Sequence, residues 1–92
     1  MGNNIKRLSA IFRALANPNR LKIIKLLMEG ERMNVTDITE KLQISFKATS
    51  NHLVLLKNLD IVEFRGAEGH VFYSFNRDLP KDIQKVINAS LK

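Results

Sequence analysis

The sequence predicts a mainly α-helical domain with one small β-hairpin, and its 92 residues suffice for a single domain spanning residues 1–92. Apolar residues recur every three or four positions through most of the chain before Asp60, as on the buried face of a helix. After Asp60 the apolar period changes to two, in two short segments rich in β-branched and aromatic residues. From about Asp78 the helical period returns.

The first two helices are separated by Asn17-Pro18. A first helix is expected from about Asn4 to Ala16, with apolar residues at Ile5, Leu8, Phe12 and Leu15. Asn17 suits the cap of the next helix and Pro18 its first position, where no amide hydrogen is needed. This second helix is expected to stop at Gly30, and its apolar residues are Leu21, Ile24, Leu27 and Met28.

The next two helices are expected to form a helix-turn-helix. A polar turn, Glu31–Met33, leads to Asn34, which suits the cap of a short helix with Val35, Ile38 and Leu42 facing inward. Gln43-Ile44 is then a tight connection, and Ser45 caps a fourth helix that ends near Asn58–Asp60. A short helix, a short turn and a second helix are typical of this motif.

A β-hairpin and a last helix complete the chain. The segments Ile61–Arg65 and His70–Phe75 are expected to be strands, with Gly66–Gly69 as the turn between them. The last helix is expected from about Asp78, with apolar residues at Leu79, Ile83, Val86, Ile87 and Leu91. This order predicts a winged helix-turn-helix with additional helices at both ends.

The apolar stripes of the two terminal helices form either core or a dimer interface. A helical chain this short can expose a stripe that a second copy must cover, which favours the interface. We therefore expect a homodimer, and the residues assigned to its interface are Ile5, Leu8, Phe12, Ile83, Ile87 and Leu91.

The fourth helix is the most informative segment for function. Its inward positions are Ala48, His52, Leu53 and Leu56, and its outward positions are Lys47, Ser50, Asn51, Val54 and Asn58. An outward face of amides, hydroxyls and an ammonium group, in place of Glu/Lys pairs, suits base edges and phosphates. This pattern predicts a helix that reads double-stranded DNA.

The charge balance also favours a polyanionic partner. Lys and Arg number 15 against 9 Asp and Glu, which gives a net charge of +6. Six cations precede the first acidic residue, Glu29: Lys6, Arg7, Arg13, Arg20, Lys22 and Lys25. The alternative interpretation of these cations is a solvated surface on two helices.

The composition argues against several other classes. The absence of cysteine excludes disulfides, thiol redox sensing and thiolate metal sites, and two distant histidines make a histidine metal site improbable. No cofactor is expected, because the chain lacks a Gly-rich phosphate loop; it also lacks a nucleophile–base pair, so it is not expected to be an enzyme. Without a secretion signal or a membrane-spanning run, the protein is expected in the cytoplasm and not at a membrane.

Two segments of the sequence carry motifs of a known family. The run from Phe12 to Leu27, with Ala14-Leu15-Ala16-Asn17-Pro18-Asn19-Arg20 within it, resembles the opening of the ArsR/SmtB-type transcriptional regulators. The fourth helix resembles the family's recognition helix at Ser45, Ser50, His52-Leu53 and Leu56. The resemblance extends in order over nearly the whole chain, including Ile61-Val62, the hairpin and Tyr73.

The resemblance implies a homodimeric repressor that binds an imperfect inverted repeat, with the first and last helices at the dimer interface. By position, it implies that Phe46, Lys47, Ser50 and Asn51 approach the major groove. The hairpin tip, Gly66–Gly69, would lie along the minor groove or the backbone.

The chain departs from the family at the positions used for metal sensing. Where metal sensors carry a Cys-Val-Cys box, this chain has Asn34-Val35-Thr36, whose neutral oxygens cannot hold a soft metal as thiolates do. The last helix, from Leu79 to Lys92, offers only Asp82 as a ligand. We therefore expect a regulator without a metal cofactor, whose effector, if it has one, is unknown.

The residues of the fourth helix each have an alternative role. Lys47 contacts a phosphate or a guanine edge, or is a solvated lysine. Ser50 and Asn51 read bases, with Asn51 suited to adenine, or only form a polar face. Phe46 packs on a thymine methyl group or folds back onto the third helix. Ser45 is first a cap, and its helix N-terminus can also meet a phosphate.

Four residues outside that face have similar alternatives. His52 either titrates near neutral pH or is packed and hydrogen-bonded, and we favour the second. Arg65 and His70 flank the hairpin turn, where they contact the DNA backbone or are simply solvated. Arg20 contacts phosphate, or has a structural role in pairing with an acid such as Asp37 or Glu40, and we favour the structural role.

Two other functions compete with repression. A transcriptional activator or anti-repressor of the same fold would carry the same residues. A winged-helix module that binds proteins would need an acidic or apolar fourth-helix face, which this sequence does not have.

Overall fold

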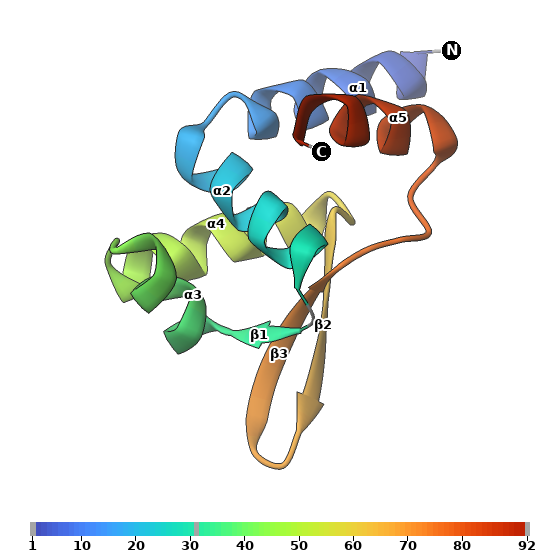
Figure 1. The fold of residues 1–92 in the computed structure, drawn as a ribbon. Helices are drawn as coiled ribbons and strands as arrows, with labels where there is room; N and C mark the ends of the chain where they lie inside the picture. The colour runs from blue at the N-terminus through green and yellow to red at the C-terminus, as the bar shows by residue number, and fades with distance from the viewer. Residues whose placement is uncertain (1, 31, 92) are drawn as a thin grey trace.

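The computed structural model describes residues 2–30 and 32–91, without the side chains of residues 2–4. Its elements, in order, are α1 (Gly2–Leu15), α2 (Pro18–Glu29), β1 (Met33–Asn34), α3 (Val35–Leu42), α4 (Phe46–Asn58), β2 (Val62–Ala67), β3 (His70–Phe75) and α5 (Lys81–Leu91). The helices gather at one end and the β2–β3 hairpin projects from them (Figure 1). The predicted winged helix-turn-helix with additional terminal helices is confirmed.

The hairpin belongs to a three-stranded antiparallel sheet of order β1-β3-β2. The prediction of a polar turn at Glu31–Met33 was wrong for Met33, which pairs with Tyr73 in β1, while Glu31 lies outside the described residues. Two residues of strand are too few to produce a detectable alternation in a sequence. β1 therefore pairs with the middle of β3 and joins the hairpin to the segment that leads into α3.

The turn of the hairpin is tighter than predicted. β2 continues to Ala67, which pairs with His70, so only Glu68 and Gly69 form the turn. Both have positive φ, 52° and 78°, as in the two-residue turns that match the twist of paired strands.

The last helix begins later than predicted. Asn76 Oδ1 accepts a hydrogen bond from the Asp78 amide at 2.9 Å and forms a local turn there. Pro80 also disfavours a helical conformation at Leu79, so α5 starts at Lys81. Leu79 lies outside the helix but is buried, as expected for an apolar side chain.

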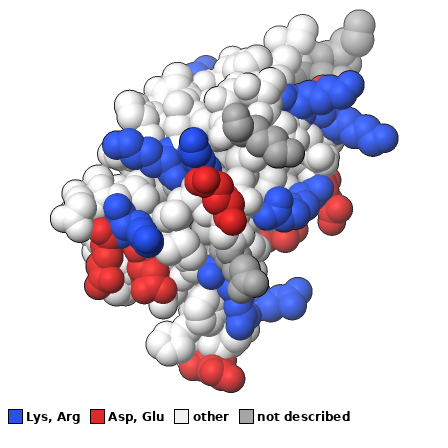
Figure 2. All heavy atoms as spheres, viewed as in Figure 1, with Lys and Arg blue, Asp and Glu red and all other residues white. Residues whose placement is uncertain are grey.

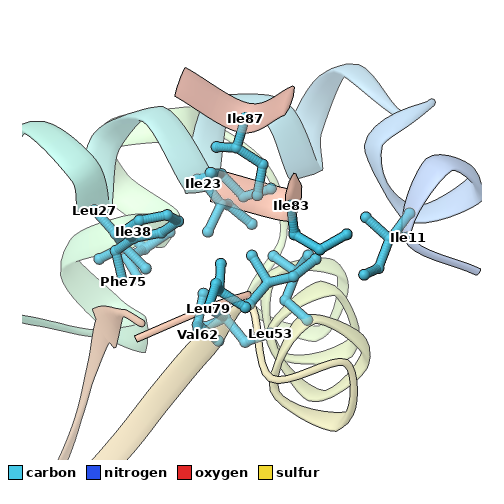
Figure 3. Close-up of a cluster of buried hydrophobic side chains, with 14 residues drawn as sticks. Ile11, Ile23, Leu27, Ile38, Leu53, Val62, Phe75, Leu79, Ile83 and Ile87 are labelled. Carbon is cyan, nitrogen blue, oxygen red and sulfur yellow. The ribbon is translucent and has the colours of Figure 1, made fainter. Parts of the chain in front are cut away.

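The core is built where the helices meet the base of the sheet, and Figure 3 shows its side chains converging from α1, α2, α4, β2 and α5. Its buried members are Ile11, Ala14, Ile23, Ile24, Leu27, Ile38, Leu53, Leu56, Ile61, Val62, Phe75, Leu79, Ile83 and Ile87. Ile83 and Ile87, predicted at the dimer interface, thus contribute to the core of one chain. Both are almost fully buried within one chain, so the inward stripe of α5 is covered without a second copy.

The rest of the predicted interface remains accessible. Ile5 is 72% exposed and Phe12 is 48% exposed, both on α1, while Leu8 and Leu91 are half-buried. Figure 1 shows α1 and α5 side by side at the end of the molecule opposite the hairpin. None of the helices in the described part of the chain is long and apolar enough to cross a membrane.

Candidate nucleic-acid interface

The orientation of α4 is fixed by polar contacts at both ends of the preceding turn. Asn34 Oδ1 caps α3 by accepting from the Asp37 amide at 2.8 Å, and Gln43 ends α3 in the left-handed region with φ of 58°. Ser45 then caps α4, where its Oγ accepts a hydrogen bond from the Ala48 amide at 3.0 Å. The predicted roles of Asn34 and Ser45 as helix caps are confirmed.

A buried threonine joins the two helices of the motif. Thr49 is fully buried, and its hydroxyl donates to the Ser45 carbonyl oxygen at 2.9 Å. It also accepts a hydrogen bond from the Thr39 hydroxyl at 2.9 Å. Because the hydroxyl has both a donor and an acceptor partner, its burial leaves no polar atom unpaired. The bond to Thr39 also links α4 to α3 and so helps to fix the angle between them.

The predicted division of α4 into two faces is confirmed. Leu53 and Leu56 are fully buried against the core. The opposite side exposes Lys47, Asn51, Val54 and Asn58 to solvent, with Ser50 half-buried at its margin. Residues three, four and seven apart lie on one side of a helix, so these groups form one surface, which we call the reading face.

Phe46 stands at the start of α4 and is 59% exposed. The ring therefore remains accessible to a partner. The exposed ring and the cationic Lys47 lie at the helix N-terminus, where the amides and the helix dipole favour a negative charge.

On the hairpin, Arg65 and His70 are both exposed. The register pairs Arg65 with Phe72 and Ala67 with His70, so these four residues share one face of the sheet. The turn itself carries the acidic Glu68, which lies between Arg65 and His70 in the sequence. A phosphate would meet Arg65 and His70 more favourably than the tip.

Two further cations, which were not predicted from the sequence, lie against aromatic rings of the sheet. The guanidinium of Arg32 lies 4.6 Å from the centre of the Phe72 ring, and the Lys57 ammonium lies 5.0 Å from the Phe64 ring centre. Arg32 could not be placed because β1 was not predicted. Lys57 was detectable, since it follows Ser50 by seven residues on the fourth helix.

Arg20 has the structural role that was favoured, but with other partners. It does not pair with Asp37 or Glu40; its Nε donates to the Ala14 carbonyl at 2.7 Å and its Nη2 to the Arg13 carbonyl at 3.3 Å. These carbonyls belong to the last turn of α1, which lacks helical partners for them. Arg20 therefore fastens α2 to the end of α1.

The same guanidinium reaches α4. Arg20 Nη1 lies 3.3 Å from Nδ1 of His52, and since a guanidinium can only donate, the ring nitrogen accepts. His52 is thus packed and hydrogen-bonded, as favoured. Burial, and secondly the positive charge of Arg20, lower the pKa of His52.

This lowered pKa predicts a pH-dependent stability. Neutral His52 contributes to the free energy of unfolding. This contribution is fully present above the pKa of His52 in the unfolded chain, about 6.5, and is lost as pH falls through its lower pKa in the folded chain. Urea unfolding of the wild type and a His52→Gln variant should therefore differ most above pH 7, with the difference shrinking toward pH 5. An equal difference at both pH values would show that protonation of His52 does not affect folding.

The charge distribution separates the elements of the motif. Figure 2 shows cationic and acidic side chains interspersed over this side of the molecule, with acidic side chains over α3, at the centre, at the right and at the lower end. α3 carries Asp37, Glu40 and Lys41, whereas α4 carries Lys47 and Lys57 and no acid. Of the two helices, α4 is the one suited to contact a polyanion.

Comparison with known proteins agrees with this geometry. The family model described as "Bacterial regulatory protein, arsR family" matches residues 17–63, about half of the chain, from the cap of α2 to the start of β2. The chain belongs to the ArsR family of bacterial regulatory proteins. It is therefore a transcriptional regulator built on a winged helix-turn-helix.

Several known proteins match most of the chain. A helix-turn-helix-type transcriptional regulator of Methanocaldococcus jannaschii is 35% identical over 83 residues, 90% of this chain and 93% of the relative. The transcriptional repressor SdpR of Bacillus subtilis is 33% identical over 72 residues, 78% of this chain and 79% of the repressor. The solved structure of HlyU from Vibrio cholerae is 26% identical with a TM-score of 0.80, covering 97% of this chain and 92% of HlyU.

Proposed function

We propose that this ArsR-family protein is a homodimeric repressor that binds a specific inverted repeat in double-stranded DNA. The observation that carries the proposal is the reading face of α4. It is capped, held by Thr49, free of acidic groups and open to solvent. Residues 1–92 would form one domain that binds DNA in the cytoplasm, with no catalytic activity.

Each exposed group has a proposed partner in the duplex. Lys47 and the amides near Ser45 bind phosphate, because both lie at the positive end of α4. Asn51 pairs with an adenine edge, Ser50 approaches a neighbouring base, and the exposed ring of Phe46 packs on a thymine methyl group. Arg65 and His70 contact the backbone beside the hairpin.

The dimer is proposed to form through α1 and the margin of α5. Ile5 and Phe12 expose apolar surface that the chain does not cover, and Leu8 and Leu91 extend it. The face lies at the end of the molecule opposite the hairpin (Figure 1). Two copies joined there would present both reading faces to one side of a duplex.

We propose that no metal controls this regulator. The described residues contain no group of three or more His, Asp or Glu side chains that could hold a metal ion, and the sequence has no Cys. The side-chain oxygen of Asn34, at the family's metal-box position, is engaged as a helix cap.

Zinc, cadmium or arsenite, each compared with a chelator-treated sample, should leave the DNA affinity unchanged. Release of DNA by any of them would contradict this proposal.

One comparison favours activation as a second candidate. In sequence alone, over a shorter stretch than the structural match, HlyU of Vibrio cholerae is 30% identical over 76 residues, 83% of this chain, and it is a transcriptional activator. An activator of this kind would use the same reading face and would differ in the placement of its site relative to the promoter.

Selection from a pool of random duplexes tests the proposed function. The enriched sequences should converge on an inverted repeat whose half-site centres lie one helical turn apart, about 34–36 Å. A single half-site, or no enrichment over the starting pool, would contradict a symmetric, sequence-specific reader.

A further inference from the structure

The reading face contains an apolar side chain that the proposed polar contacts do not explain. Val54 is 54% exposed in the middle of α4. Its neighbours at helical spacing on that face are Ser50, Asn51 and Asn58, which are all polar.

Val54 does not stabilise the isolated chain in any evident way. A β-branched residue is a weaker helix former than alanine, and an exposed one gains little from burial. It also lies on α4, whereas the apolar surface proposed for the dimer lies on α1 and α5. Its methyl groups are therefore available to an apolar partner that reaches this face.

In a major groove, the C5-methyl group of thymine is the apolar group that a base edge presents. Resting on the proposed function, we propose that Val54 packs against a thymine methyl group and is a specificity-determining residue of the operator. Water leaves both groups on contact, so the pairing favours thymine over cytosine, whose edge presents an amino group and no methyl.

The position of Val54 also predicts where that thymine lies. Val54 follows Asn51 by three residues, about 4.5 Å along the helix axis, which is comparable to one base-pair step of about 3.4 Å. Asn51 suits the adenine edge and Val54 the thymine methyl group. Together they would read one A·T pair or two adjacent A·T pairs in each half-site.

Replacement of thymine by deoxyuridine removes only the methyl group and tests this inference. Duplexes carrying the enriched operator would be substituted at one symmetric pair of thymines at a time and titrated with the full chain. Substitution at the pair of thymines that Val54 contacts should weaken wild-type binding by about fourfold per half-site. This is the affinity lost when one methyl-sized group is no longer buried. A Val54→Ala variant should lose a similar factor on the thymine operator and be insensitive to that substitution.

Leu55→Ala is the matched control, because Leu55 is the next exposed apolar residue and lies on another side of α4. It should keep the wild-type sensitivity to deoxyuridine. Thermal unfolding should show that Val54→Ala stays folded, since alanine favours the helix.

Two results would overturn the inference. Either no thymine position affects the wild type, or every thymine position that weakens the wild type weakens Val54→Ala equally. In both cases the wild type would still prefer the operator to a scrambled duplex. Loss of that preference would instead refute the proposed function itself.

Discussion

A variant with both Ile5 and Phe12 replaced by asparagine is expected to be a monomer that binds its operator on the order of 100-fold more weakly than the wild type. The two side chains contribute the most exposed apolar surface of α1. Asparagine removes that surface without changing the net charge, so the electrostatic attraction to DNA is kept. Each monomer would then bind one half-site without the gain that a second, linked half-site provides. Sedimentation at micromolar concentration measures the first effect and a mobility-shift titration the second.

Phe64→Asn provides the matched control, because Phe64 is also about half exposed but lies on the hairpin. It should sediment as a dimer, like the wild type. If the Ile5/Phe12 double variant also remains dimeric, the interface lies elsewhere and the proposed role of α1 is wrong.

Substitutions of Asn51 and Lys47 are expected to weaken DNA binding in different ways. Asn51→Ala should remove about 1–3 kcal/mol of discrimination per half-site, and only at the position where adenine is read. Its two hydrogen bonds to a base edge depend on the base, so other operator positions should keep their preference. Affinities for operators with each base at every position measure this effect.

Lys47→Ala is expected to weaken binding to all sequences by a similar factor. A lysine bound to phosphate releases counterions whatever the neighbouring base, so the salt dependence should fall by about one unit per half-site. The slope of affinity against salt concentration measures this. Base-specific losses in the Lys47 variant, or uniform losses in the Asn51 variant, would contradict the division of roles.

Local chemistry explains why the helices were predictable from the sequence. The side-chain oxygens of Asn17, Asn34 and Ser45 each accept a hydrogen bond from the backbone amide three residues later. Such caps depend only on neighbouring residues. The apolar spacing of α4 correctly predicted which side is buried, because a 3.6-residue period leaves only one face for the core.

The features that were missed depend on contacts between distant segments. β1 exists because Met33 and Asn34 pair with β3, about forty residues along the chain, and two residues cannot reveal such a strand. Arg20 donates to backbone carbonyl groups. Every residue has such a group, so the sequence could not show which residues are its partners. The apolar stripe that contains Ile83 and Ile87 looks the same in the sequence whether it packs in its own chain or against a second copy. Only the folded structure assigns both residues to the core.

The central claim is that the exposed side of α4 recognises a DNA sequence, and a competition titration tests it most directly. Labelled operator would be displaced by unlabelled operator or by a scrambled duplex of the same composition, at low and at physiological salt. At physiological salt, we expect the operator to bind at least about 1,000-fold more tightly than the scrambled duplex. Both affinities should fall as salt rises. Equal affinities for the two duplexes would contradict the account.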